Sequence, residues 1–352
     1  MPVVSLTSAE SVANFAPADR LRPVRIWLYV VALMVLAMVV VGGITRLTDS
    51  GLSITSWQPI SGAIPPLSEA DWSAEFEAYK QIPQFKLLNQ DMTLEGFKYI
   101  FWWEWTHRFL GRVIGVVFAL PFLVFLVQRR FSWSLAAPLA GLFVLGGLQG
   151  ALGWWMVSSG LAELTSVSQY RLAAHLGAAL LLFLALIWVA RRLSPAHPVP
   201  VDADRGSVRL LLAMIFLQVI AGAFVAGLDA GMGYNTWPLM DGALVPNGLG
   251  AIDPWWKNLF ENALTVQFVH RTIAYVIVLY VGALWVWKRG AGGGAKGWLP
   301  RIALLVLLQV ALGIATLVLS VPLPLALGHQ ALAFMLAGAT VAWLADITPR
   351  RG

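Results

Sequence analysis

Residues 170–192 read Tyr-Arg-Leu-Ala-Ala-His-Leu-Gly-Ala-Ala-Leu-Leu-Leu-Phe-Leu-Ala-Leu-Ile-Trp-Val-Ala-Arg-Arg, an almost unbroken apolar run. A helix rises about 1.5 Å per residue, so about 20 such residues cross a hydrocarbon layer about 30 Å thick. His175 lies a few residues from one end of the run, and Arg191 and Arg192 close the other end. The stretch predicts a membrane-spanning helix that carries a histidine inside the membrane, near one surface.

The composition extends this prediction to the whole chain. Of the 352 residues, 59% are hydrophobic and 12% are charged, whereas soluble domains carry about 25% charged residues. Cysteine is absent, which excludes disulfides, thiolate metal sites and iron–sulfur clusters. The net charge of +6 fits cytoplasmic anchoring charges, and no basic run interleaved with aromatics indicates a nucleic-acid partner. We predict eight spans, at about 25–45, 104–128, 133–157, 170–192, 208–228, 264–288, 300–321 and 325–346.

The lysines and arginines give the chain an orientation. If residue 1 is cytoplasmic, most of the 24 Lys and Arg residues fall on the cytoplasmic side. The positive-inside rule then places both termini in the cytoplasm. The tryptophan pairs 102–103, 154–155 and 255–256 fall near the predicted outer ends, as in an aromatic belt. No small-residue cleavage site follows the first apolar run, so we expect a retained span rather than a signal peptide.

The chain also repeats itself, and the matches are polar or glycine positions in one order, which chance similarity among apolar segments does not explain. The matching positions are Asp49 and Asp229, Gly51 and Gly231, Trp57 and Trp237, Gly62 and Gly242, His107–Arg108 and His270–Arg271, 148–153 and 308–313, and His175 and His329. Each copy has four spans, so both copies have one orientation and are expected to be related by a pseudo-two-fold axis along the membrane normal. The predicted fold is therefore all-α, with two tandem four-helix bundles. The predicted parts are a cytoplasmic tail 1–24, an N-terminal bundle 25–192 with a long outer loop 46–103, a cytoplasmic linker 193–207, a C-terminal bundle 208–346 and a cytoplasmic tail 347–352.

Four histidines fall at one predicted depth, just below the outer surface. They are one per even-numbered span: His107, His175, His270 and His329. Two histidines on facing helices of a bundle can hold a haem iron from both sides. Interhelical hydrogen bonding is the simpler reading of a single intramembrane histidine, but it does not explain four at matched depth. A zinc site would need a third ligand, and we expect the fifth histidine, His197, to be solvated in a loop.

Residues around the histidines fit this interpretation. Gly111 and Gly115 follow His107 at helical spacing, and Ala333 and Ala337 follow His329, which leaves room for a flat macrocycle. Close helix packing would also favour small residues there. Four arginines near the outer ends would suit anionic haem propionates, although interfacial anchoring is an alternative role. These are Arg108, Arg112, Arg171 and Arg271.

The two copies differ at one informative position. The first reads Glu104-Trp-Thr-His107-Arg108 and the second Gln267-Phe-Val-His270-Arg271. Glu104, His107 and Arg108 lie on one face of a helix. A partly buried carboxylate one turn from a haem ligand is suited to proton transfer, whereas the alternative is a surface ion pair with Arg108. We expect the first half to perform chemistry and the second to hold a fixed cofactor.

The long outer loop 46–103 contains a predicted helix. Ser68 and Asp71 have the spacing of a capping box, and Trp72, Phe76 and Tyr79 follow at helical spacing. We expect a short amphipathic helix on the membrane surface. Two roles stay open, a packing element or a lid over the bundle.

These motifs resemble haem A synthase. The residues that carry the resemblance are Gly-Gly-Ile-Thr-Arg-Leu-Thr-Asp-Ser-Gly-Leu-Ser at 42–53, Trp57-Gln-Pro59, the Glu104–Arg108 motif and the second His-Arg at His270. The resemblance covers about residues 25–345, and the absence of cysteine resembles members of proteobacterial and mitochondrial type, so a thiol-dependent step cannot operate. It implies oxidation of the C8 methyl group of haem O to a formyl group, which gives haem A for terminal oxidases.

The resemblance also implies roles for residues. His107 and His175 would flank the substrate haem O, His270 and His329 would ligate haem b, and Glu104 would be the family's essential glutamate. Arg108 and Arg271 are our candidates for cofactor binding. The implied location is the bacterial inner membrane, with the haem sites near the periplasmic side. Membrane lipid surrounds the chain, and haem O synthase, oxidase assembly factors and a further copy of the chain are candidate partners, with the electron donor left open.

Two other functions compete with this one. A dihaem b-type membrane cytochrome that passes electrons from quinol explains the four histidines equally well, but not the Glu104 and Gln267 difference. A transporter of two parallel repeats predicts a polar path at the midplane, where this chain is mostly Leu, Val and Ala. Chemistry and loop structure remain alternative roles for four outer residues: Arg46, Asp49, Asp229 and Asn235.

Overall fold

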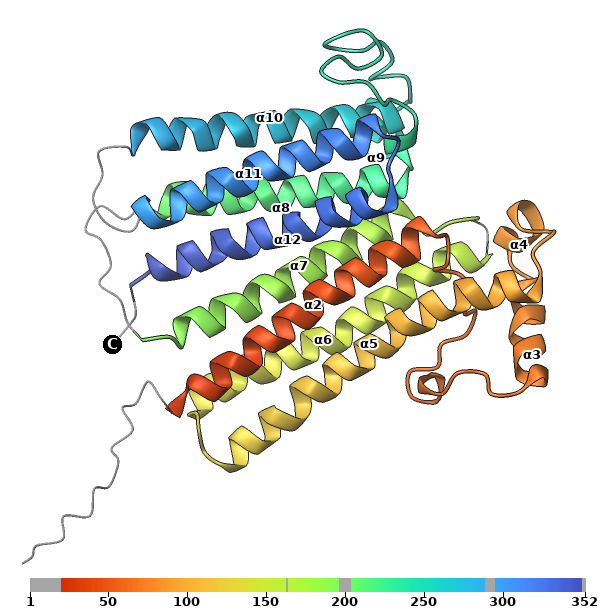
Figure 1. Cartoon of the computed structure of the whole chain (residues 1–352), viewed down its shortest axis with the longest axis horizontal. Coiled ribbons are helices and arrows are strands. Elements are labelled where there is room, and N and C mark those ends of the chain that lie inside the picture. The colour runs from red at the N-terminus through yellow and green to blue at the C-terminus, as the bar shows by residue number, and fades with distance from the viewer. Residues whose placement is uncertain (1–19, 163, 196–203, 289–294, 350–352) are drawn as a thin grey trace, which may run out of the picture.

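The computed structural model describes residues 20–162, 164–195, 204–288 and 295–349, with the side chains of 295 and 296 left out. Within these residues, eight helices are long and apolar enough to cross a membrane. They lie side by side along one direction (Figure 1). They confirm the eight predicted spans and the all-α fold class. His197 and much of the predicted tails and linker lie outside the described residues.

The helix bounds agree with the predicted spans to within a few residues, with one exception. The second span begins at Leu94 rather than near residue 104, because Thr93 caps a helix that continues beyond the apolar run. Residues 94–103 of the predicted outer loop 46–103 are therefore helical. The eight long helices are α2 (Arg22–Leu47), α5 (Leu94–Val127), α6 (Trp133–Ala162), α7 (Gln169–Arg192), α8 (Arg205–Gly227), α10 (Ala263–Trp287), α11 (Ala295–Val318) and α12 (Leu323–Asp346).

The helix contacts repeat between the two halves of the chain. In the first half α2 contacts α5 and α7, and α6 contacts α5 and α7; in the second half α8 contacts α10 and α12, and α11 contacts α10 and α12. Between the halves, the contact of α7 with α8 matches that of α12 with α2, and α7 also meets α12. This is the set of contacts that two tandem bundles related by a two-fold axis would make.

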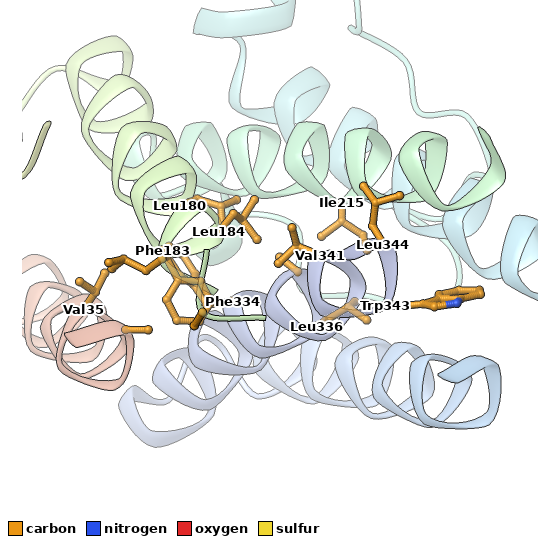
Figure 2. Close-up of a cluster of buried hydrophobic side chains, with 14 of the residues drawn as sticks. Val35, Leu180, Phe183, Leu184, Ile215, Phe334, Leu336, Val341, Trp343 and Leu344 are labelled. Carbon is orange, nitrogen blue, oxygen red and sulfur yellow. The ribbon is translucent and has the colours of Figure 1, made fainter. Parts of the chain in front are cut away.

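The core lies where the two halves meet. Phe183 of α7 and Phe334 of α12 have ring centres 5.6 Å apart. Figure 2 shows them beside Val35 of α2, with Ile215 of α8 farther along the cluster, near Leu344 of α12. Gly338 allows this approach, since a Cβ there would lie 3.0 Å from the Phe183 ring. The buried residues of α2, α7, α8 and α12 thus form one continuous cluster.

The outer segments gather at one end of the bundle, opposite the start of α2 and the end of α12 (Figure 1). The first contains η1 (Ser61–Ala63), α3 (Glu69–Tyr79) and α4 (Pro83–Leu88), and the second contains η2 (Ala230–Met232), η3 (Trp255–Lys257) and α9 (Asn258–Glu261). The predicted capping box is confirmed, because the Ser68 hydroxyl accepts from the Asp71 N–H and the Asp71 carboxylate accepts from the Ser68 N–H.

The apolar face of α3 packs on protein. Phe76 stacks on Phe97 of α5 at 5.1 Å between ring centres, and Trp72 meets Phe101 edge to face at 4.9 Å. Phe97 is fully buried at the centre of this outer cluster. Residues 94–103 of α5, which precede the predicted span, therefore form the surface against which α3 packs.

Replacing Phe97 with alanine should weaken the packing of α3 on α5. Truncation of a buried phenylalanine costs about 3–5 kcal/mol, and here the loss falls on α3 rather than on the spans. We expect limited proteolysis of the Phe97→Ala variant in membranes to cut between α2 and α5 at least tenfold faster. Tyr99→Ala, on an exposed face of the same helix, is the control, and equal cleavage of the two variants would contradict the assignment.

Candidate functional site

The four histidines predicted from sequence lie on α5, α7, α10 and α12, one on each. All four are half-buried. The rings of His270 and His329 lie edge to face, with centres 6.4 Å apart and planes at 72°. In the first half His107 lies within electrostatic reach of His175. The structure thus brings the histidines together in the two pairs that the sequence predicts.

Each histidine ring packs against a glycine on the preceding long helix. A Cβ atom on the glycine would approach the ring to 3.0 Å at Gly42 and His107, 3.1 Å at Gly153 and His175, 3.1 Å at Gly222 and His270, and 2.8 Å at Gly313 and His329. Contacts this short leave no room for a side chain. Glycine therefore holds each ring against a helix backbone, so that the ring is half-buried but not crowded.

Three glutamines contact histidines and were not recognised as site residues from the sequence. The Gln149 amide lies 3.1 Å from Nδ1 of His175 and donates to its carbonyl at 2.7 Å. Gln309 makes the same two contacts with His329, at 3.2 and 3.0 Å. Gln218 lies 3.2 Å from Nε2 of His270. The signal was present in the repeat, since Gln149 and Gln309 occupy matching positions.

The second-half pair fits a metal between two imidazoles. An imidazole nitrogen lies about 2 Å from a bound metal ion, so two rings on opposite sides of one ion have centres roughly 6 Å apart, as His270 and His329 do. Nδ1 of His270 is buried without a hydrogen-bond partner, which is costly for a polar atom inside a protein. No cluster of three or more His, Asp or Glu ligands exists among the residues described. The donor set suits a haem iron, whose other ligands come from the porphyrin.

Glu104 is buried, with its side chain only 3% exposed, and is not part of a surface ion pair. One carboxylate oxygen accepts from the Ser53 hydroxyl and from the Ile54 N–H, both at 2.8 Å. The other accepts from the Arg108 guanidinium at 2.6 and 3.0 Å. Four hydrogen bonds therefore hold the carboxylate at the junction of α5 with the first outer loop.

The second half repeats this junction with a neutral amide. Gln267 accepts from Arg271 at 2.9 Å and donates to the Ala230 carbonyl at 2.7 Å. Arg271 also donates to the carbonyls of Tyr234 and Thr236, as Arg108 does to those of Ile54 and Ser56. The predicted duplication thus extends to the hydrogen bonds of the two arginines, whereas the carboxylate that accepts from Ser53 and Ile54 is replaced by an amide that donates to Ala230.

The four arginines expected near haem propionates all bind backbone carbonyls. Besides Arg108 and Arg271, Arg112 donates to Gln58 and Pro59, and Arg171 donates to Trp155. Irregular segments need such donors, because their carbonyls have no helix or sheet partner. Two buried guanidinium nitrogens, Nη1 of Arg112 and Nε of Arg271, have no partner. Both atoms are donors without an acceptor in the described part of the chain.

The four outer residues whose roles the sequence leaves open make contacts that hold the loops and the two halves together. Arg46 binds Asp229 at 2.8 Å, the Ala226 carbonyl at 2.9 Å and Asp49 at 3.5 Å, so it joins the two halves. Burial raises the pKa of Asp49, while Arg46 lowers it and Asp229 raises it. Asn235 donates to the carbonyls of Gly231 and Leu317 and ties the second outer loop to α11.

A cavity of about 310 Å³ lies under the first outer loop, between the loop, α3 and α5. Arg108 and Arg112 line one wall and Glu75 of α3 lines another. Burial raises the pKa of the Glu75 carboxyl; Arg108 lowers it and Glu104 raises it. Arg108 therefore contacts both the buried Glu104 carboxylate and the cavity.

Removing Arg108 should destabilise the first half more than neutralising Glu104. Breaking a buried pair by removing one partner costs about 3–5 kcal/mol, because the other charge stays buried. Glu104→Gln should be milder, since Gln267 already accepts from Arg271 in this way. We expect Arg108→Gln to lower the thermal unfolding midpoint of the detergent-purified protein by several degrees more than Glu104→Gln. The double variant should recover most of the loss, and no recovery would argue that Arg108 acts only through the loop carbonyls.

Comparison with known proteins gives one consistent result. The family model described as cytochrome oxidase assembly protein matches residues 25–341. A haem A synthase of Azorhizobium caulinodans is 58% identical over 313 residues, covering 88% of this chain and 89% of that protein. A haem A synthase of Rhizobium rhizogenes is 52% identical over 348 residues, covering 97% and 95%, and one of Parvibaculum lavamentivorans is 52% identical over 319 residues, covering 90% and 91%. With eight spans, two histidine pairs and these matches along nearly its whole length, the chain belongs to the cytochrome oxidase assembly protein family.

Proposed function

We propose that this protein is a haem A synthase, which oxidises the C8 methyl group of haem O to a formyl group and so makes haem A for terminal oxidases. The observation that carries the proposal is the pair of histidine sites inside a chain 58% identical to a haem A synthase. A methyl group on a porphyrin is unactivated, and no side chain can oxidise it without a redox partner. The histidines supply the means of holding iron porphyrins at two places.

The two halves would have different tasks. His107 and His175 would receive the substrate haem O, and His270 and His329 would hold haem b. The 6.4 Å separation of the His270 and His329 rings supports the second assignment. Haem b, when bound, would supply one-electron chemistry beside the substrate half.

The chain's own residues would orient the histidines and keep a charge in place. Gln149, Gln218 and Gln309 contact His175, His270 and His329, and such partners fix the orientation of a ligating imidazole. Glu104 would keep a negative charge one turn from His107 on α5, with its carboxylate accepting a hydrogen bond from the Ser53 hydroxyl. Nη1 of Arg112 and Nε of Arg271 would be available to haem propionates.

The protein is a multi-pass membrane protein with eight spanning helices in the described part of the chain. We propose that both termini face the cytoplasm of a bacterial cell and that the histidine pairs lie near the periplasmic side of the inner membrane. The cytoplasmic excess of Lys and Arg supports this orientation. A haem O synthase would deliver the substrate, and oxidase assembly factors would receive the product.

Pigment extraction tests the proposal. The protein should be expressed in a host that makes haem O but no haem A, and the haems extracted from the membranes should be separated by chromatography. We expect haem A in addition to haem b. Haem b alone would favour the dihaem cytochrome that passes electrons without changing a substrate, and colourless protein would remove both functions.

The Glu104 carboxylate should be required where its counterpart amide is not. Glu104→Gln should keep both haems, because Arg108 can bind the amide as Arg271 binds Gln267, but haem A formation should fall at least tenfold. Gln267→Glu is the reciprocal control and should retain activity. Full turnover by Glu104→Gln with both haems present would show that the charge is structural only.

A further inference from the structure

A four-residue spacing recurs on the helices that face the histidines. Each glycine that supports a histidine ring is preceded, one helical turn earlier, by a larger residue on the same face. That residue is Gln149 before Gly153, Gln218 before Gly222 and Gln309 before Gly313. Before Gly42 it is Met38. The fourfold pattern therefore has one departure, and it lies opposite His107.

The departure removes a hydrogen bond. Each of the three glutamines contacts its histidine at 3.1 to 3.2 Å. Met38 has no amide group to pair with the ring, and its methyl group instead packs beside Gly111, one turn from His107, where a Cβ would lie 3.0 Å from it. Among the described residues, no side-chain hydrogen bond to the His107 ring is formed. The His107 ring is thus held by packing alone.

The orientation of the ring differs as well. At Gly153, Gly222 and Gly313 the ring atom closest to the glycine is Cε1 of the histidine. At Gly42 the closest atom is Nε2 of His107. His107 is thus the one ring of the four whose nearest atom to the supporting glycine is a nitrogen rather than a carbon.

We propose that His107 is the exchangeable ligand of the substrate haem, while His175 stays bound. The inference rests on the proposed function, in which a haem O held by two permanent imidazoles would have no free axial position. A hydrogen-bonded partner typically changes the affinity of a metal ligand 10- to 100-fold, so the unassisted His107 is the weaker ligand of its pair. Met38 occupies the place of a fourth glutamine and leaves the His107 ring free to turn.

The two histidines of the first half should therefore behave differently when removed. In membranes from a host that makes haem O, His107→Ala should keep extractable haem O near the level of the unmodified chain, with the reduced haem O binding carbon monoxide. His175→Ala should lose most of its haem O. Haem b at His270 and His329 is the internal reference and should not bind carbon monoxide in either variant. Equal haem O loss in the two variants would overturn the proposal.

A glutamine at position 38 should hold the His107 ring in place and slow its exchange on the haem iron. Met38→Gln places an amide where Gln218 contacts His270 in the second half, so we expect the rate of carbon monoxide binding to reduced haem O to fall at least tenfold. Met34→Gln, one turn earlier on α2 and so farther from Gly42, adds the same amide away from His107 and should match the unmodified chain. Carbon monoxide binding to Met38→Gln at the unmodified rate would contradict the inference.

The proposed function and this inference fail in different ways. If the unmodified chain forms no haem A and holds no haem O, the proposed function is wrong. If it forms haem A, but His107→Ala and His175→Ala have the same haem content and carbon monoxide binding, the function stands and the ligand assignment is wrong.

Discussion

The interior of a membrane provides no water to a polar side chain, and the arrangement of this protein follows from that constraint. Each histidine inside a span needs a partner from another helix. Glycines bring a helix backbone up to each ring, and three glutamines place an amide beside it. The same constraint acts at the outer ends, where Arg108 and Arg271 supply donors to loop carbonyls. Helix packing, loop placement and the histidine sites thus depend on satisfying polar groups away from water.

The sequence predicted the fold because hydrocarbon thickness imposes a length on every apolar run, and eight runs gave eight helices. The predicted start of α5 was too late. The turns before the apolar run are stabilised by the Thr93 cap and by the packing of Phe97 under α3. A hydropathy pattern detects neither interaction. Glu104 was recognised by comparing the halves. Its burial was not, because Ser53 and Ile54 reach it from a distant segment.

The histidines were visible from sequence because polar residues in apolar runs are few. Their glutamine partners are equally polar, but from the sequence Gln149 and Gln309 indicate only that the chain repeats. A glutamine four residues before a glycine has no meaning until the facing helix is known. The arginines were assigned to an anionic ligand on charge alone, whereas backbone carbonyls of the outer loops are their nearest acceptors. Charge predicts what a side chain attracts, and loop geometry decides which acceptor is within reach.

Arg46 occupies the position in the first copy that Ala226 occupies in the second, and its guanidinium donates to the carbonyl of Ala226 itself. In an ancestral dimer of two identical four-helix units, the same contact would bring two guanidiniums together where this protein has one. In a single chain one guanidinium serves both matching aspartates, Asp49 and Asp229, so only one copy needs the arginine. The link is asymmetric, since the first copy supplies the cation and the second supplies an aspartate and a carbonyl oxygen. Two copies within one chain are free to differ in this way, which two identical subunits are not.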